Sequence, residues 1–596
     1  MASNRLADFN GGDDEEEALQ QAIAMSLGET PRASVSASVT MDARSSPEVV
    51  SFPATSMSAL GLDRRKMEEE RLARLKKRKK ESGFNVQERE EVLPPAQRRR
   101  LMNVQPADEP TASQPVLPTP PTNLTSNVHN DETSLRTTSV YATARLPYPK
   151  GIVLRTWARG SPRGDDIKIE EVLQKDALEL AVFSSYQWDE EWLMAKLNLT
   201  KTKVLLIAYA ADEATKAAMR DNVPATVIRF CFPPMEHGAS CMHSKLQLLK
   251  YPKYIRIVVP TGNLVAYDWG ETGVMENMVF LIDLPRIEDH AKRSTNVLTP
   301  FGIELQFFLK AQGVDEKMVA SLRNYDFSET SRYGGGSHSN MDVWQRTGYC
   351  GLGRTVKALG LDSDGHIDMD YICSSIGAVN NDLLTALYNA CKGDSGVKEY
   401  EARTGKPRKK KDVSTAANQR DFAGHIRVYF PSGDTVRQSR GGPNSAGTIS
   451  FQSRWWDSES FPSEVLRDSR PARPGLLLHS KIIFVRRPVS ETDGSASGWA
   501  YVGSHNLSES AWGRLVKDRN TGQPKLNARN WECGVLIPVS TSQGLKAKDT
   551  VSYGTTEGPQ MLDLFRDAVP IPVELPGAPY ADGDKAMLRP WFYQEN

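Results

Sequence analysis

The sequence predicts an α/β protein built around two sheets and preceded by an N-terminal tail without a folded core. Three observations lead to this prediction. At 596 residues the chain is long enough for two or three domains. From about residue 141 onward, short apolar runs alternate with helical stretches, which is the rhythm of βαβ units. One pattern of polar residues beside apolar runs occurs once in each half of this region.

Composition narrows the class of protein. Lys and Arg total 74 and Asp and Glu total 74, so any basic surface for nucleic acid must be local. Six cysteines without a Cys-x-x-Cys pair argue against a disulfide framework or a structural zinc site. Because no apolar run approaches the ~18 residues that span a bilayer, and the first thirty residues lack an apolar signal core, we expect a soluble intracellular protein without a membrane partner.

Residues 1–140 are rich in Ser, Thr, Pro and charge, which predicts disorder. Within them, residues 15–29 begin with an acidic run and continue as a predicted helix. One face of this helix is formed by Leu19, Ala22, Ile23 and Ser26. This pattern resembles a ubiquitin-interacting motif, which implies that ubiquitin or a ubiquitylated protein binds these four residues. An amphipathic helix without a dedicated partner is the alternative.

A basic segment occupies residues 64–100 of the tail. Glu/Arg and Glu/Lys pairs at helical spacing favour a solvated helix, which ends in a Lys/Arg-rich run. Such a run is typical of a nuclear import signal or a phosphate-binding patch. A nuclear function would favour the first.

The elements of the folded region follow from the apolar runs. In the first half we expect strands at 178–183, 204–209, 255–259 and 278–281, with helices at 192–199 and 215–221. In the second half we expect a helix at 383–391 and strands at 426–430, 476–485, 499–502 and 534–539. The basic segment 395–414 is expected to be an exposed loop. The predicted domains are 141–345 and 346–596, after the tail at 1–140.

The duplicated pattern carries the chemistry. His243-Ser244-Lys245 precedes an apolar run, a second run and Asn263; His479-Ser480-Lys481 precedes two runs and Asn506. A polar insertion at 491–498 accounts for the longer spacing in the second copy. On a strand, His and Lys two positions apart project from one face, so two such sets facing each other would enclose one tetrahedral anion.

This arrangement suits phosphodiester cleavage without a metal. One imidazole attacks phosphorus while the other protonates the leaving oxygen, and the lysine and asparagine side chains stabilise the phosphoryl oxygens. A third His-x-Lys, at 290–292, lies in a charged stretch without the following pattern, and we assign it no role.

The doubled motif resembles the phospholipase D superfamily, and most closely its tyrosyl-DNA phosphodiesterase family, type one. Lys250 and Arg486 stand where the superfamily usually has Asp, which is a mark of that family. Five further matches cover about 145–595: Ser184–Tyr186, Asn263–Trp269, Ser374–Gly377, Asn506–Gly513 and Trp531–Leu536. The resemblance implies two similar α-β-α sandwich domains packed about a pseudo-twofold axis.

The resemblance also implies roles for single residues. His243 would be the nucleophile and His479 the general acid and then base. The phosphate would be held by Lys245, Lys481, Asn263 and Asn506. Glu532 would orient one of the histidines, and Glu276 would occupy the matching place in the first half, with Asn277 as the alternative. No metal or other cofactor is implied.

The implied substrate is a DNA 3′ end that carries a tyrosine or peptide of trapped topoisomerase I, or another 3′ block. DNA would contact Tyr186, Ser374, Ser375 and Ser504, and the enzyme would be a nuclear monomer of DNA repair. A lipid-cleaving phospholipase D and a non-catalytic ubiquitin-binding scaffold are the competing hypotheses. The missing Asp residues weigh against the first, and the two intact His-Lys-Asn sets weigh against the second.

Overall fold

The computed structural model describes residues 146–235, 240–337, 344–404, 422–488, 497–540, 561–580 and 589–592. The predicted disordered tail, with both of its motifs and the four expected ubiquitin-binding residues, lies outside this range. Within the described residues, no helix is both long and apolar enough to cross a membrane.

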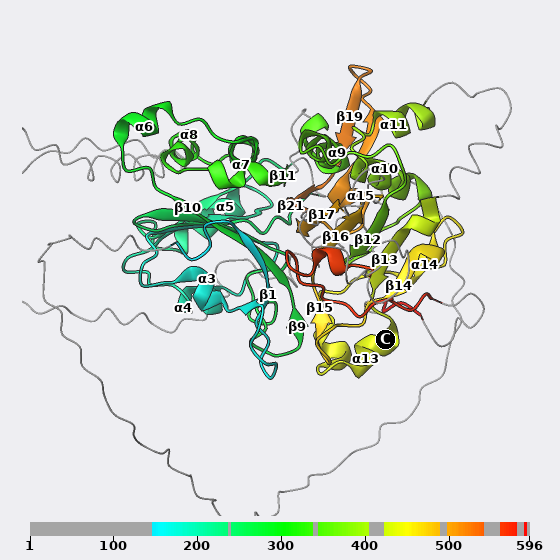
Figure 1. Ribbon diagram of the computed structural model, residues 1–596. Helices are drawn as coiled ribbons and strands as arrows, with labels where there is room; N and C mark the ends of the chain where they lie inside the picture. Colours follow the sequence, from blue (N-terminus) through cyan, green and yellow to red (C-terminus); the bar gives the residue numbers. More distant parts are fainter. Residues whose placement is uncertain are drawn as a thin grey trace, which may run out of the picture. The chain divides into compact units, whose positions relative to one another are not determined.

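The first half forms an eight-stranded mixed sheet (Figure 1). In spatial order its strands are β2 (Asp166–Ile167), β1 (Ile152–Thr156), β10 (Met278–Pro285), β8 (Tyr254–Pro260), β7 (Gln247–Lys250), β3 (Leu180–Ser184), β4 (Lys203–Ile207) and β5 (Ile228–Cys231). Its helices are α3 (Ile169–Leu173), α4 (Glu190–Ala195), α5 (Glu213–Asp221), α6 (His290–Thr295), α7 (Pro300–Ala311) and α8 (Glu316–Ala320), followed by the 3-10 turns η2 (Ser321–Asn324) and η3 (Ser328–Arg332).

The second half forms a seven-stranded mixed sheet. In spatial order its strands are β11 (Gly334–Ser337), β21 (Cys533–Ser540), β17 (Ser497–Gly503), β16 (Ile482–Arg486), β12 (Asp368–Ile372), β13 (Ile426–Phe430) and β14 (Leu466–Asp468). Its helices are α9 (Gly348–Ala358), α10 (Asn381–Cys391), α11 (Val397–Thr404), α13 (Gly433–Gln438), α14 (Ser453–Trp456) and α15 (Glu509–Trp512). Its 3-10 turns are η4 (Trp344–Arg346), η5 (Phe422–His425), η6 (Gly442–Ser445), η7 (Ser463–Val465) and η8 (Asp563–Phe565).

The two sheets repeat one topology. The order β10-β8-β7-β3-β4-β5 in the first corresponds strand for strand to β21-β17-β16-β12-β13-β14 in the second. The directions agree as well: β3 and β12 each have a parallel and an antiparallel neighbour at the corresponding place. The predicted α/β fold with two related sheets is therefore confirmed. Strand β11 precedes the expected boundary at 345 but pairs with β21, so the second sheet begins earlier than the sequence suggested.

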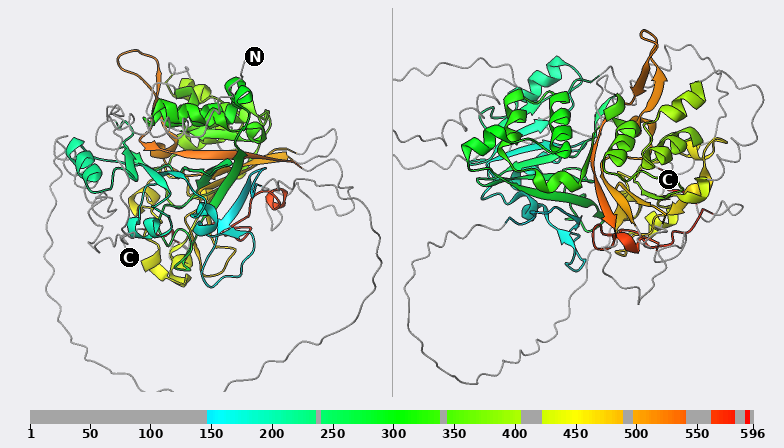
Figure 2. Two further views of the ribbon diagram at one scale, coloured as in Figure 1. Left: turned by 90° about the vertical axis from the view of Figure 1, so that its left-hand side faces the viewer. Right: turned by 45° about the horizontal axis from the view of Figure 1, so that its top comes forward.

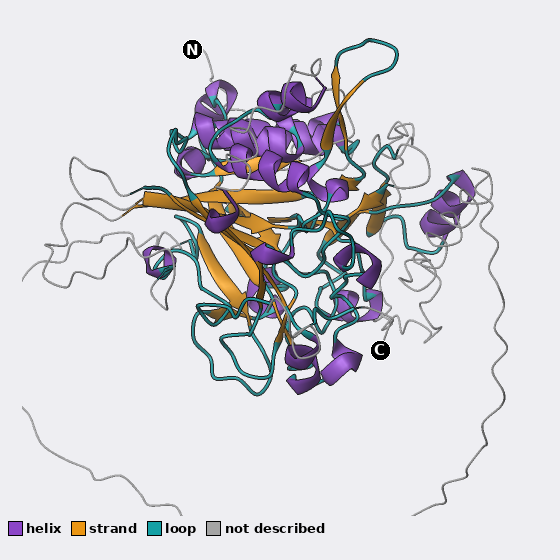
Figure 3. Ribbon diagram, turned by 90° about the vertical axis from the view of Figure 1, so that its right-hand side faces the viewer, coloured by secondary structure: helices purple, strands orange, loops and turns teal. Residues whose placement is uncertain are grey.

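Helices and strands lie in separate layers (Figure 3), and alternate side chains of a strand enter the cores on its two faces. Leu180 and Val182 of β3 join a core shared with the second sheet, whereas Ala181 and Phe183 join a core under α3, α4 and α5. The shared core also includes the inner face of β17, through Ala500 and Val502, among others. A third core lies between the second sheet and helices α9 and α10. The halves thus pack through their sheets, as two views of the ribbon show (Figure 2).

Two expectations about local structure need correction. The segment expected as a loop at 395–414 contains helix α11, because Tyr400 is buried and Glu399 and Arg403 form an ion pair one turn apart. The strand expected at 476–485 is split into β15 (Leu477–Leu478) and β16, and His479–Lys481 lies in the gap. The first-half motif lies in the same kind of gap, between β6 (Cys241–Met242) and β7.

Candidate active site

Two small sheets join the halves immediately before the two histidines. Strand β6 pairs in parallel with β20 (Asn530–Trp531), and β15 pairs in parallel with β9 (Met275–Glu276). Each His-Ser-Lys segment therefore follows a short strand that pairs with the other half, and then enters the large sheet of its own half. The predicted strands are interrupted at the motifs because the chain there changes its pairing partner, from a strand of the other half to the large sheet of its own half. This change of partner also sets both motifs at the seam between the halves.

The first histidine is held by a carboxylate from the second half. His243 Nδ1 lies 2.9 Å from Glu532 Oε2, and the His243 amide donates to the carbonyl of Trp531 at 3.0 Å. The other oxygen of Glu532 accepts from Asn530 Nδ2 at 2.9 Å. Glu532 is fully buried, so both its oxygens depend on these partners. With Nδ1 occupied, Nε2 is the nitrogen of His243 that is left for chemistry.

The second histidine mirrors this arrangement. His479 Nδ1 lies 3.1 Å from Asp268 Oδ2, a carboxylate of the first half, and the His479 amide donates to the carbonyl of Glu276 at 3.1 Å. Asp268 is itself fixed by the amide of Asn263 at 2.7 Å and by Asn277 Nδ2 at 3.2 Å. Each half thus supplies a histidine to the site and the carboxylate that orients the other histidine.

The two motif lysines are buried and close enough to influence each other. Lys245 Nζ donates to the His243 carbonyl at 2.8 Å, and Lys481 Nζ donates to the carbonyl of His479 and, at 3.3 Å, to that of Thr261. Burial, together with the charge of Lys245, holds the pKa of Lys481 well below its usual value. Because burial and mutual repulsion disfavour the ammonium forms of these two lysines, an anion between them would be stabilising.

Burial is also the main influence on the histidines. It lowers the pKa of His243, while Glu532 opposes this shift and Lys245 adds to it. It likewise lowers the pKa of His479, against the opposing effect of Asp268. Both imidazoles are therefore biased toward the neutral form.

The two asparagines are oriented differently. Asn506 Oδ1 accepts from the amides of Ser374 and Ser375, at 3.3 and 3.0 Å, and from the Ser374 hydroxyl at 3.2 Å, which leaves its Nδ2 for another acceptor. Asn263 Nδ2 instead donates to Gln187 Oε1 at 3.2 Å, and Asn263 Oδ1 is buried without a hydrogen-bond donor. A half-turn of the Asn263 amide would direct its NH₂ group to the place of that oxygen.

Two family models match the sequence of this chain. A family model described as tyrosyl-DNA phosphodiesterase matches residues 152–581, and a model of the ubiquitin interaction motif matches residues 14–30. The chain belongs to the tyrosyl-DNA phosphodiesterase family. It is therefore a phosphodiesterase of DNA repair with an N-terminal ubiquitin-interacting motif.

Related proteins are distant in sequence. Tyrosyl-DNA phosphodiesterase 1 of Drosophila melanogaster is 23 % identical over 442 residues, covering 71 % of this chain and 70 % of that protein. The Arabidopsis thaliana protein of the same name is 22 % identical over 480 residues, covering 72 % and 71 %. The crystal structure of yeast tyrosyl-DNA phosphodiesterase shares the fold, with a TM-score of 0.51 at 17 % identity, covering 74 % of this chain and all of that one.

In this member of the tyrosyl-DNA phosphodiesterase family, Glu276 does not reach the histidines. Its carboxylate forms an ion pair with Arg473 and lies 3.7 Å from Arg155, on the opposite side of β9 from the site. The expectation that Glu276 matches Glu532 is therefore corrected. Extended by one residue, the β9–β15 register sets Asn277 opposite His479. The β6–β20 register, extended in the same way, sets Glu532 opposite His243. Asn277 acts on His479 indirectly, because its Nδ2 donates to Asp268, the carboxylate that contacts His479.

The residues expected to contact DNA divide into two groups. Ser374 and Ser504 are completely buried and hydrogen-bonded within the protein, to Asn506 and to Cys533 respectively. They support the site rather than face a ligand. Tyr186 is partly exposed, and its ring centroid lies 5.2 Å from that of His243. Ser375 is also partly exposed.

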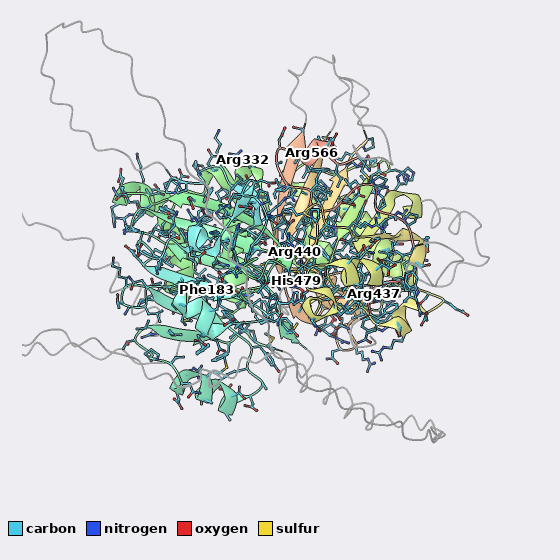
Figure 4. All side chains as sticks on the ribbon, turned by 90° about the horizontal axis from the view of Figure 1, so that it is seen from below. Phe183, Arg332, Arg437, Arg440, His479 and Arg566 are labelled. Carbon is cyan, nitrogen blue, oxygen red and sulfur yellow. The ribbon has the colours of Figure 1, made fainter. Side chains whose placement is uncertain are left out.

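Sequence reasoning missed Asp268 and Asn530. Asp268 was present in the Asn-Leu-x-x-x-Asp-Trp match, but nothing in its spacing connected it with a histidine 211 positions later. Asn530 precedes the Trp-Glu match by one residue. Arg440 is a further bridge between the halves, donating to the carbonyls of Arg159 and Gly273 at 3.0 and 3.1 Å. Figure 4 labels Arg440 and His479 where the two halves meet.

Proposed function

We propose that this enzyme hydrolyses the phosphodiester between a DNA 3′ end and a tyrosine, left by a trapped type IB topoisomerase, through a covalent phosphohistidine. The observation that carries the proposal is the pair of crossed dyads, His243–Glu532 and His479–Asp268, beside two mutually repelling lysines. A phosphodiester is the anion whose cleavage uses two imidazoles in complementary roles.

In the first step, Nε2 of neutral His243 attacks phosphorus and the bond from phosphorus to the tyrosine oxygen breaks. His479 donates its Nε2 proton to that oxygen, so the tyrosine leaves as a neutral phenol. The lowered pKa of His243 keeps its lone pair free, and the hydrogen bond from Nδ1 to Glu532 stabilises the positive charge that develops on the ring. Lys245 and Lys481 stabilise the phosphoryl oxygens.

In the second step, the roles of the imidazoles change. Neutral His479 takes a proton from water, the water oxygen attacks phosphorus, and the phosphorus–nitrogen bond to His243 breaks. The products are a DNA 3′-phosphate and the starting enzyme. Asp268 serves both steps, since it holds His479 Nδ1 whether the ring is charged or neutral.

His479 must be protonated before the first step, and bound substrate favours this protonation. Burial and the charges of Lys481 and Lys245 lower the pKa of His479, while Asp268 raises it. A bound phosphodiester brings a negative charge that offsets the lysines, so we expect substrate to raise the pKa of His479. Substrate binding thus favours the protonated form of His479, the acid that the first step requires.

A 3′-phosphotyrosyl oligonucleotide in EDTA tests the function. We expect conversion to the 3′-phosphate oligonucleotide on a denaturing gel, with His243→Ala inactive. His479→Asn should accumulate a covalent protein–DNA adduct, because the second step loses its base. Turnover of phosphatidylcholine without oligonucleotide cleavage would favour a lipid phospholipase D, and no turnover of either would favour a scaffold.

We further propose that the tail binds ubiquitin through Leu19, Ala22, Ile23 and Ser26, and that the enzyme acts in the nucleus. The match to the ubiquitin interaction motif supports the first proposal, and DNA repair together with the basic segment at 64–100 supports the second. Ala22→Arg should abolish ubiquitin pull-down and leave oligonucleotide cleavage unchanged. Retained ubiquitin binding would contradict the assignment of this face.

A further inference from the structure

A basic hairpin projects from the second half beside the catalytic seam. It consists of β18 (Arg514–Lys517) and β19 (Pro524–Asn527), which pair antiparallel and extend beyond the surrounding helices (Figures 1 and 3). The hairpin follows α15, which comes directly after the Asn506 motif, and it precedes β20, which leads into Glu532. Both ends of the hairpin therefore connect to the active site.

The base of the hairpin is held firmly. Leu515 is completely buried, its amide donates to the Tyr349 hydroxyl at 3.1 Å, and its carbonyl accepts from Arg403 at 2.6 Å. At the other end, the carbonyl of Arg529 accepts from the amide of Cys241 at 3.2 Å, two residues before His243. These contacts fix where the hairpin leaves the protein relative to the nucleophile.

The tip is also ordered by its own hydrogen bonds. The Asp518 carboxylate accepts from the amides of Asn520 and Thr521, at 2.9 and 2.7 Å, and from the Thr521 hydroxyl at 3.0 Å. Gly522 has φ +69°, a left-handed conformation that glycine adopts without strain. The single acidic side chain of the hairpin is thus engaged in forming the turn.

Most cations of the hairpin form no ion pair with an acidic side chain among the described residues. Within the part of the chain that the structure describes, none of the ion pairs involves Lys517, Arg519 or Arg529, and all three side chains are well exposed. Lys525 is half-buried, and its charge acts on the nearby Asp518 carboxylate. Arg514, at the base, differs: it pairs with Glu509 at 3.0 Å and with Asp382 at 3.3 Å. Since the whole chain has no net charge, this is a local concentration of positive charge.

We infer that this hairpin binds the phosphate backbone of DNA next to the 3′ end that enters the active site. The inference rests on the proposed function and adds a second contact outside the catalytic pocket. DNA is the occupant because its phosphates recur at close, regular spacing, which suits several unpaired cations on a projecting ribbon. The hairpin also leads directly into β20, which precedes Glu532 and pairs with β6, the strand that precedes His243.

The test compares long and short substrates. The variant carries Lys517→Glu, Arg519→Glu and Lys525→Glu, and leaves Asp518, Gly522 and the buried base unchanged. The long substrate is a 3′-phosphotyrosyl duplex of about thirty base pairs, and the short one is a 3′-phosphotyrosyl dinucleotide. We expect kcat/KM on the duplex to fall at least about tenfold through KM, and the slope of log affinity against log salt to decrease by about 2 to 3. Both kcat and the dinucleotide reaction should stay unchanged.

A matched control reverses the same number of charges away from the site: Lys175→Glu, Lys253→Glu and Lys292→Glu. Lys253 precedes β8, whose seven residues separate it by roughly 20 Å from the catalytic end of that strand. Equal losses in the control and the hairpin variant, or no loss in either, would overturn the inference. Binding of a 3′-phosphate duplex, measured by fluorescence anisotropy, separates the two proposals, because it responds to the hairpin even if tyrosyl-DNA cleavage is absent.

Discussion

His479 and Asp268 come from different halves of the chain, yet His479 Nδ1 lies 3.1 Å from Asp268 Oδ2 with both side chains buried. The reciprocal pair, His243 and Glu532, has the same construction at 2.9 Å. Neither half contains a complete dyad. Catalysis therefore depends on correct docking of the halves, which the β6–β20 and β9–β15 pairs provide.

Asp268→Asn should slow the enzyme and move its pH optimum. Asp268 raises the pKa of His479, so its loss lowers that pKa further and reduces the protonated fraction at neutral pH. We expect kcat/KM to fall about 100-fold or more, and the rate profile to shift to lower pH. The measurement is kcat/KM on a 3′-phosphotyrosyl oligonucleotide across pH 5 to 9. Glu276→Gln is the control, because that carboxylate contacts Arg473 instead, and an equal shift there would refute the dyad.

Asn530→Ala should impair catalysis by releasing Glu532. Asn530 donates to Glu532 Oε1 at 2.9 Å, and Asn530 Oδ1 accepts from the Cys241 thiol at 3.1 Å. Loss of one hydrogen bond to a buried carboxylate corresponds to about 1.5 kcal/mol, or roughly a tenfold decrease in kcat with little change in KM. Asn530→Asp should lose more, since two adjacent carboxylates repel. Asn527→Ala, whose exposed side chain lies at the end of β19, is the control; a rise in KM alone would contradict a positioning role.

Arg473→Met should destabilise the protein by about 3 to 5 kcal/mol. Arg473 pairs with buried Glu276, lies 3.4 Å from buried Asp166 and donates to the Thr156 carbonyl at 2.7 Å, so its removal leaves carboxylates buried with fewer partners. Adding Glu276→Gln should restore part of the loss, because the uncompensated charge disappears. Urea denaturation of both single variants and the double variant measures the coupling. Strict additivity would show that the ion pair contributes nothing.

Stability should fall in acid partly through Glu532. Burial opposes ionisation of Glu532, but the charge and hydrogen bond of His243 outweigh this and lower its pKa to about 2. A carboxyl whose pKa is lower in the folded state contributes stability above its unfolded pKa of about 4.3, and loses it as the pH falls toward 2. Glu532→Gln should therefore lose less unfolding free energy than the wild type between pH 5 and pH 3. Parallel curves in urea denaturation would count against this linkage.

The sequence by itself determined the layers and the chemistry. Continuous apolar runs predict strands that are buried on both faces, because alternate side chains enter different cores, as those of Leu180 and Ala181 do. The doubled His-x-Lys and Asn pattern predicts a phosphate site because these side chains are chemically suited to one anion. Strand patterning and side-chain chemistry are local properties, so a short stretch of sequence is enough to predict them.

The tertiary structure alone decided which carboxylate serves which histidine. The family resemblance implied Glu276, whose carboxylate pairs with Arg473, whereas Asp268 is the carboxylate that reaches His479 where β9 and β15 align across the seam. It also decided that Ser374 and Ser504 are buried supports rather than DNA contacts. Such pairings depend on how two distant strands register against each other. That register is a property of the packed halves, and no single stretch of sequence encodes it.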